Sequence, residues 1–346
     1  MCPTKSGAPS WAGTWPGSSG FPGEPMRRLD VVAVGELNPD LILGGMSGPP
    51  RLGREILAEH CAFTLGSSTA LCAANLAALG LSVGIVGKVG ADDFGEFVVK
   101  RLDQRGIDTS RVIRDAAVRT GITVSLAYPE DRAMLTFAGA MAHLAAEDVD
   151  SEYLASARHL HVSSLFLQRD LQPGCAELLR RMKARGLTIS LDPGWDPAET
   201  WDAGIENLYG LLDIFFVNRV EAVALGKDRE WRRAAGRLAK RTPLLVVKGG
   251  PDGASVIQDE HWEEHPGFRV DAMDPTGAGD AFNAGFLFGY LAGWPRATCL
   301  TWGNACGAMT VRQSGGSGAF TSRADVERFI RTQEESSGGC PEADLE

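Results

Sequence analysis

The chain has 346 residues, of which 44% are hydrophobic and 23% are charged, and its formal net charge is −10. This composition is typical of a globular protein, and the length allows one large α/β domain or two small ones. The negative charge argues against nucleic acid or an anionic membrane as the main partner, because both require a basic surface.

The cysteines and the apolar runs bear on the cellular setting. The seven cysteines are scattered without a Cys-x-x-Cys pair. They indicate neither a disulfide framework nor a zinc site, and a cytoplasmic protein is expected. No apolar run reaches the roughly 20 residues that cross a bilayer. Residues 1–26 are predicted to be a disordered extension and residues 333–346 a flexible tail, with one domain over residues 27–332 between them.

The first predicted strand covers residues 29–35, an apolar run that ends in glycine and is typical of a strand buried in a parallel sheet. Asn38 and Asp40 follow at the carboxyl end of this strand, where open α/β sheets place their ligands. A simple Asn-Pro-Asp turn would explain the same residues.

Two regions, residues 41–63 and 111–137, differ from the rest of the chain in their short alternating segments. Within the second region, residues 119–137 predict a β-hairpin with a polar turn. Between the two regions, Ser67 or Ser68 can cap a helix that is rich in alanine and leucine.

From residue 159 the chain alternates between strand and helix patterns, which argues for a parallel sheet covered by helices on both faces. The predicted strands are residues 159–163, 188–192, 213–218 and 244–248, and the predicted helices are residues 171–185 and 231–241. His159 and His161 stand two positions apart on one strand with no further ligands nearby. They are expected to pack or to form hydrogen bonds rather than to bind a metal.

Polar residues follow two of these strands. Asn218 and Glu221 have the spacing of a capping box at the start of a helix. Lys248 ends another strand and leads into a turn that contains Gly250 and Gly253, which a plain hairpin would also explain.

The most informative stretch is residues 274–291, a turn and a small-residue loop followed by apolar residues at helical spacing. Gly277, Ala278 and Gly279 fall at the N-terminus of the predicted helix, where unpaired N–H groups and the positive end of the helix dipole bind anions. Asp280 lies in the first turn. An aspartate there can be only a cap or a dipole partner, but a cap does not require three small residues before it.

These motifs, in this order over about residues 29–332, resemble those of the ribokinase-like, or PfkB-type, carbohydrate kinases. The resemblance implies an α/β, ribokinase-like three-layer fold, with a mostly parallel central sheet, helices on both faces and a small β-sheet lid from residues 41–63 and 111–137. It also implies that Asp280 is the base that takes the proton of the substrate hydroxyl. The N–H groups of Gly277–Gly279 are then expected to hold the charge of the transferring phosphoryl group.

The resemblance assigns the binding of the acceptor sugar to Asn38, Asp40, Gly66, Ser67 and Ser68. The usual Gly-Gly pair of the family is Gly66-Ser67 in this chain, and the usual asparagine falls on Leu71. Because these positions touch the sugar in the family, the departure bears on the choice of substrate rather than on the reaction.

The resemblance further implies ATP and Mg²⁺ as cofactors. The residues expected to bind the nucleotide are Asn218, Lys248, Gly250, Gly253 and Asn304. Asn218 and Glu221 are expected to organise the water shell of Mg²⁺, which keeps several waters in proteins. Asp274 and Thr276 match positions that bind a monovalent cation such as K⁺. Asn304 can instead satisfy a buried backbone group, and Asp274 can be only the polar residue of a turn.

The sequence therefore predicts an ATP-dependent kinase that phosphorylates a hydroxyl of a small sugar or sugar acid, of the ribose, fructose or 2-keto-3-deoxygluconate type. A nucleoside kinase stays open, and so does a phosphosugar kinase, which would need a basic site such as Arg119 or Arg132. From a different class, a non-catalytic sugar- or nucleotide-sensing relative stays open.

Three other classes of site lack their motifs in this sequence. The P-loop motif, a Gly-x-Gly-x-x-Gly after the first strand and the Gly-x-Ser-x-Gly hydrolase motif are all absent. The family resemblance also suggests a homodimer through the lid, and neither a nucleic acid nor a membrane partner is expected.

Overall fold

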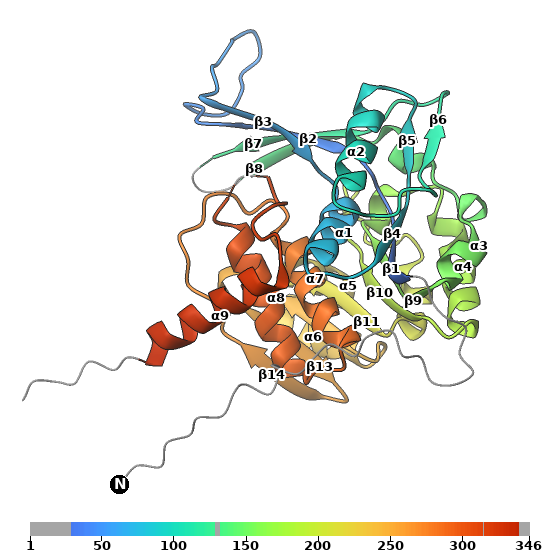
Figure 1. Cartoon of the computed structure of the whole chain (residues 1–346), viewed down its shortest axis with the longest axis vertical. Helices are drawn as coiled ribbons and strands as arrows, with labels where there is room; N and C mark the ends of the chain where they lie inside the picture. The colour runs from blue at the N-terminus through green and yellow to red at the C-terminus, as the bar shows by residue number, and fades with distance from the viewer. Residues whose placement is uncertain (1–28, 129–131, 314, 339–346) are drawn as a thin grey trace, which may run out of the picture.

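A computed structural model describes residues 29–128, 132–313 and 315–338 (Figure 1). The predicted extension over residues 1–26 lies outside the described residues. Helix α9 (Arg323–Gly338) continues past residue 333, and the remainder of the predicted tail, residues 339–346, also lies outside them.

The centre of the fold is an eight-stranded sheet with the order β14-β13-β12-β11-β10-β9-β1-β4 (Figure 1). Neighbouring strands are parallel from β4 to β12, and β13 and β14 complete the sheet in antiparallel fashion. Its strands are β1 (Leu29–Val34), β4 (Val83–Val86), β9 (Ala157–Ser163), β10 (Thr188–Asp192), β11 (Ile214–Asn218), β12 (Leu245–Lys248), β13 (Ala254–Gln258) and β14 (His261–His265). The four strands predicted after residue 159 are therefore confirmed.

Helices cover both faces of this sheet, because successive side chains of a strand point to opposite sides. Val31 and Ala33 belong to one buried cluster, whereas Val32 and Val34 belong to the other. The first cluster includes residues of α1 (Ser68–Ala78), α2 (Asp93–Asp103), α7 (Ala278–Leu291), α8 (Arg296–Thr310) and α9. The second includes residues of α3 (Ser151–Ala155), α4 (Gln172–Ala184), α5 (Arg219–Gly226) and α6 (Trp231–Ala239). The predicted three-layer fold is confirmed.

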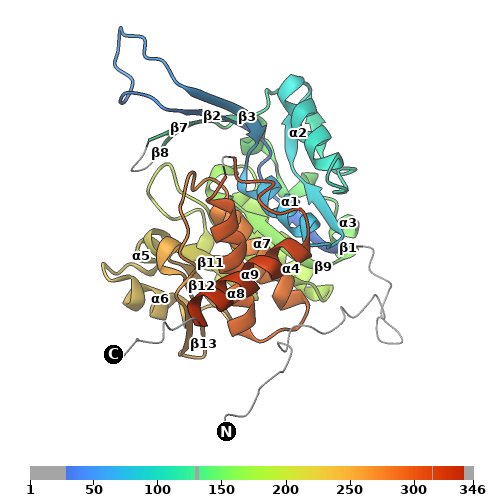
Figure 2. The ribbon, with the colours of Figure 1, turned by 60° about the vertical axis from the view of Figure 1, so that its left-hand side comes forward.

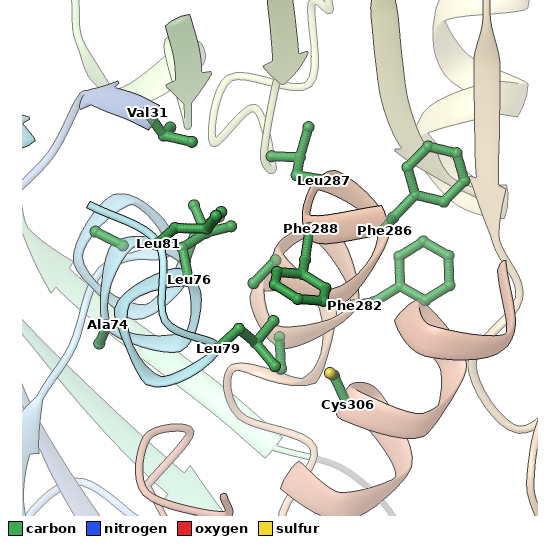
Figure 3. Packing of buried hydrophobic residues seen from close by; sticks show 14 of the residues in the cluster. Val31, Ala74, Leu76, Leu79, Leu81, Phe282, Phe286, Leu287, Phe288 and Cys306 are labelled. Carbon is green, nitrogen blue, oxygen red and sulfur yellow. The ribbon is translucent and has the colours of Figure 1, made fainter. Parts of the chain in front are cut away.

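The apolar stretch after Asp280 forms the centre of the first cluster. Phe282 and Phe286 of α7 pack toward the sheet and α8, and Leu76 and Leu79 lie on the side of α1 (Figure 3). Burial of each such side chain contributes about 1.5–3 kcal/mol. The start of α7 is therefore held in place by the core of the protein.

The lid is a separate four-stranded sheet with the order β3-β2-β7-β8, which projects from the main body (Figure 2). It consists of β2 (Pro39–Gly44), β3 (His60–Leu65), β7 (Ile122–Ala127) and β8 (Arg132–Phe137). Strands β7 and β8 form an antiparallel hairpin, as predicted. Strand β6 (Ile113–Asp115) falls in the second predicted lid region but pairs with β5 (Lys88–Gly90) in a separate two-stranded sheet, so the lid sheet is smaller than predicted.

The two strand histidines are packed and hydrogen-bonded, as predicted. His159 contacts the hydroxyls of Thr188 and Ser190 at 2.7 Å each, and His161 contacts Ser190 at 2.7 Å. Burial lowers the pKa of both imidazoles, so they remain neutral in the core.

Candidate active site

The first turn of α7 has the features of an anion site. Gly277 precedes the helix with a φ of 73°, a left-handed conformation that favours glycine, and an added Cβ would lie 2.6 Å from Cα of Gly316. Within the described part of the chain, the N–H groups of Gly279 and Asp280 have no protein acceptor. Exposed donors at the positive end of a helix are well suited to bind a phosphoryl group.

Asp280 stands at this turn with its carboxylate only partly exposed. Its pKa is raised to about 7, chiefly by burial and then by the charge of Asp192, against the lowering effects of Lys248, a hydrogen bond to Ser68, and Arg132. A carboxylate with a pKa near neutrality can take a proton from an attacking hydroxyl. The predicted base therefore has a suitable environment for that chemistry.

Asn38 and Asp40 lie at the junction of the main sheet and the lid, and both are buried. The side-chain amide of Asn38 donates to the Asp40 carboxylate at 3.2 Å. An added Cβ at Gly66 would lie 2.0 Å from Asp40 Oδ1, so only glycine leaves room for this carboxylate. Burial, and next the charge of Asp280, raises the pKa of Asp40 to about 7.

Ser67 and Ser68 lie between the lid strand β3 and helix α1. Ser67 caps the helix by accepting from the N–H of Ala70 at 3.1 Å, and its φ of 64° is a left-handed value that favours glycine. The glycine that the family resemblance predicts at this position would adopt this φ without strain. The N–H of Ser68 donates at 2.8 Å to the buried carboxylate of Glu36, a residue that the sequence analysis did not single out.

Lys248 and a carboxylate that the sequence analysis also missed form a buried pair near α7. The Lys248 ammonium is paired with Asp192 at the end of β10. The side-chain amide of Asn283 donates to the same carboxylate oxygen at 2.6 Å. The signal in the sequence was the position of Asp192, which ends a predicted strand at the edge where ligands bind.

Asp274 and Thr276 form a tight turn before α7. The Asp274 carboxylate accepts from the N–H of Thr276 at 2.8 Å and from the N–H of Gly315 at 3.0 Å. The guanidinium of Arg132, on the lid strand β8, donates to the Thr276 hydroxyl at 2.9 Å. The lid therefore reaches the start of α7 through Arg132, whereas Arg119 lies near Asp92 at the start of α2.

The sequence model of the pfkB family of carbohydrate kinases matches residues 28–323. The chain belongs to this family. Carbohydrate kinase activity, as predicted, is the activity of the family.

Individual relatives of this pfkB-family kinase differ in their acceptors. The chain is 34% identical over 266 residues to the ATP-dependent ribose-1-phosphate kinase of Halopiger xanaduensis, a match that covers 77% of the chain and 86% of that protein. It is 28% identical to the 5-dehydro-2-deoxygluconokinase of Geobacillus kaustophilus, covering 90% and 96%. A candidate ribokinase II from E. coli, solved with ATP and Mg²⁺, has 24% identity and a TM-score of 0.78 over 88% of the chain and 99% of that protein.

In this pfkB-family kinase, Asn218 and Glu221 form a complete capping box at the start of α5. The Glu221 carboxylate accepts from the N–H and the amide of Asn218 at 2.8 and 2.7 Å. Burial, and next the charge of Asp192, raises the pKa of Glu221 to about 7, so a nearby cation would favour its ionised form.

The donor set fits Mg²⁺ only through water. Among the described residues, no group of three or more His, Cys, Asp or Glu side chains could hold a metal ion. In proteins that bind phosphates, Mg²⁺ keeps several of its waters and makes only a few protein contacts, mostly to carboxylate oxygens. Glu221 and Asn218 would then contact the metal-bound waters.

The remaining predicted nucleotide residues lie in the turn after β12 and in helix α8. Gly250 and Gly253 belong to the turn between β12 and β13, which is the hairpin that the sequence left open, and both have positive φ values of 60° and 84°. An added Cβ at Gly253 would lie 1.9 Å from the carbonyl oxygen of His265. Asn304 donates to the Leu300 carbonyl in its own helix at 2.9 Å, which is the alternative role considered for it.

The described helices also bear on membrane association. None of those in residues 29–128, 132–313 and 315–338 is long and apolar enough to cross a bilayer.

Proposed function

We propose that this chain is an ATP-dependent kinase that transfers the γ-phosphoryl group to a hydroxyl of a small sugar or sugar acid. The observation that supports this proposal is the first turn of α7. There the carboxylate of Asp280, the N–H groups at Gly279 and Asp280 and the ammonium of Lys248 converge. A base, an anion site and a cation side by side are the requirements of phosphoryl transfer.

The proposed reaction is an in-line displacement. Asp280 orients the acceptor hydroxyl and takes its proton while the hydroxyl oxygen forms a bond to the γ-phosphorus and the bond to the leaving ADP oxygen breaks. The backbone around Gly277, Ala278 and Gly279 stabilises the charge on the transferring group, and Lys248 adds a positive charge. Mg²⁺ bound with ATP would supply further positive charge to the phosphates.

The acceptor is proposed to bind between the lid and the start of α1. Asn38 and Asp40 can hydrogen-bond its hydroxyls, since a carboxylate accepts two such bonds at once. The tight packing of Asp40 against Gly66 supports this assignment because it fixes the carboxylate. Ser67 and Ser68 complete this side of the site.

The cofactor side is proposed to use the remaining predicted residues. Lys248, Gly250, Gly253 and Asn304 would contact ATP, and Asn218 and Glu221 would contact the waters of Mg²⁺. Asp274 and Thr276 would bind a monovalent cation such as K⁺, as the family resemblance implies for these two buried residues of one turn.

A phosphorylated acceptor is the second candidate, and Arg132 favours it. Its guanidinium reaches Thr276 and influences the carboxylates Asp40 and Asp280. An arginine over a site that otherwise contains carboxylates can bind the phosphate or carboxylate of an acceptor in bidentate fashion. The resemblance to a ribose-1-phosphate kinase points in the same direction.

The test is an acceptor panel with MgATP, measured by ADP release and by detection of the phosphorylated product. The panel contains ribose, fructose, 2-keto-3-deoxygluconate, 5-dehydro-2-deoxygluconate, ribose 1-phosphate, fructose 6-phosphate and adenosine. Turnover of a sugar or sugar acid is expected. Exclusive turnover of adenosine would replace the proposal by a nucleoside kinase, and binding without turnover would favour a sensing protein.

A homodimer through the lid is also proposed. Apolar side chains on β8, Met134, Leu135 and Phe137, are exposed on the lid sheet, and a second copy could cover them. Light scattering at micromolar concentration should give twice the mass of the chain. A monomer would refute this part of the proposal.

A further inference from the structure

A buried ion pair ties three elements of the fold together beside Asp280. Lys248 at the end of β12 and Asp192 at the end of β10 have side chains that are only 14% and 8% exposed. Asn283 of α7 donates to the same oxygen of Asp192 at 2.6 Å. One carboxylate oxygen therefore joins β10, β12 and α7.

The ammonium of Lys248 faces the proposed anion site. An added Cβ at Gly279 would lie 3.5 Å from Nζ, so the charge stands against the first turn of α7. A lysine head is a compact charge on a flexible stem and needs a partner to stay in one position. Burial would lower the pKa of Lys248, but the charges of Asp192 and Glu221 outweigh burial and raise it.

We propose that Asp192 is a positioning residue for phosphoryl transfer, which holds the Lys248 ammonium against the first turn of α7 and, with Asn283, fixes that turn relative to β10 and β12. This inference rests on the proposed function. Asp192 itself is not expected to touch either substrate. Its role is to place Lys248, which would meet the transferring group.

The pair also sets the charge around the proposed base. The charged groups that influence Asp280, or are influenced by it, come from several elements: Asp192 of β10, Lys248 of β12, Arg132 of β8, Asp40 of β2, Glu221 of α5 and Glu36 after β1. After burial, the charge of Asp192 is the largest influence that raises the pKa of Asp280, and the charge of Lys248 opposes it. Removal of the Asp192 charge should therefore lower the pKa of Asp280, and removal of the Lys248 charge should raise it.

The experiment compares Asp192→Asn, Lys248→Met and the double variant in the full chain. For Asp192→Asn we expect kcat to fall by about tenfold or more, since a misplaced charge costs transition-state stabilisation. Its Kd for MgATP, measured by calorimetry, should stay level or decrease, because a buried negative charge near the phosphates is gone. For Lys248→Met the same Kd should rise by about tenfold.

The pH profile of kcat supplies a readout that a purely structural ion pair would not change. Its acid limb should move to lower pH in Asp192→Asn and to higher pH in Lys248→Met. In the double variant, which removes both charges of the pair, the limb should return toward that of the wild type while kcat stays low. The double variant also serves if Asp192→Asn fails to fold.

Asp213→Asn is the matched control. Asp213 forms a lysine ion pair with Lys183 at 2.8 Å, away from the start of α7, so its loss should change neither MgATP binding nor the pH profile.

Two results would overturn the inference. One is a Kd for MgATP that rises about threefold or more in Asp192→Asn but not in Asp213→Asn. The other is an acid limb that moves in the same direction in both single variants, or in neither. MgATP binding requires no acceptor. The Kd measured by calorimetry therefore tests the role of Asp192 even if no compound of the panel is phosphorylated. A wild-type chain that binds MgATP but phosphorylates none of the panel would refute the proposed function instead.

Discussion

The phosphoryl side of the site (Asp192, Lys248, Gly277–Gly279 and Asn283) and the acceptor side (Glu36, Asn38, Asp40 and Gly66–Ser68) differ in how their charges are balanced. On the phosphoryl side, the lysine and the carboxylate are paired, and the N–H groups of the helix start are available for an anion. On the acceptor side, neither buried carboxylate forms an ion pair among the described residues. Burial raises the pKa of Glu36 to about 8 and that of Asp40 to about 7.

This difference indicates what each side recognises. A preset cation and exposed N–H groups suit the fixed geometry of a phosphoryl group, which is common to the whole family. Carboxylates without a paired cation suit hydroxyl donors, whose number and spacing vary from one sugar to another. We therefore propose that the phosphoryl side determines the reaction and that the acceptor side, together with Arg132, determines the substrate.

Of the variants Gly277→Ala, Arg132→Gln and Glu36→Gln, we expect Gly277→Ala to have the largest effect, a loss of kcat through damage to the phosphoryl side. The left-handed φ of Gly277 is costly for any other residue, and the new Cβ would collide with Gly316. Since the N–H groups that follow would shift, kcat should fall by about 10²-fold. The control is Gly236→Ala in α6, where no atom lies within 4 Å of the new Cβ and kcat should not change. Similar kcat values for both variants would contradict this view of the helix start.

Arg132→Gln tests whether the acceptor side recognises an anionic group of the substrate. If the acceptor carries a phosphate or carboxylate, its KM should rise by about 10- to 100-fold, as expected for the loss of a charge-assisted hydrogen bond. With a neutral sugar from the panel, KM should change much less. Arg119→Gln, from the same lid region but near Asp92, is the control and should leave both KM values unchanged. Equal effects of Arg132→Gln on neutral and anionic acceptors would exclude a role in recognising the anion.

Glu36→Gln tests whether the acceptor side holds an unfavourable buried charge, and the measured quantity is thermal stability as a function of pH. Its effect should be the smallest of the three variants. The raised pKa means that folding favours the protonated form, so the contribution of Glu36 is complete below pH 4.5 and is lost as the pH rises through about 8. Gln mimics the protonated form. Its Tm advantage should be small at pH 5 and reach about 2–4 °C by pH 9.

Calorimetry or fluorescence across this pH range measures the effect, with the exposed Glu96→Gln on α2 as the control. An advantage that did not grow with pH would show that Glu36 carries no unfavourable charge.

The sequence was most informative where the site is built from neighbouring residues. Gly277 to Asp280 are contiguous, and the anion site depends on a helix start, which a local pattern predicts. The lid hairpin is likewise encoded by local alternation. These parts of the fold and of the site could therefore be predicted before the structure was known.

Contacts between distant segments could not be predicted in this way. Asp192, Lys248 and Asn283 come from three elements, and their contact depends on the order of the strands in the sheet. The left-handed φ of Ser67 was also hidden, because a serine gives no sign of a backbone that usually requires glycine. Local patterns indicate which residue types are present, whereas tertiary packing decides which of them meet.

The central claim is that Asp280 is the base at the junction of the two sides. The most direct test is Asp280→Asn with the best acceptor of the panel, with kcat and the Kd for MgATP measured on the same preparation. Loss of a general base should lower kcat by about 10²- to 10⁴-fold. The Kd for MgATP should stay within about threefold, because Lys248 and the helix N–H groups remain in place. A variant that keeps kcat within about twofold of the wild type would contradict the account.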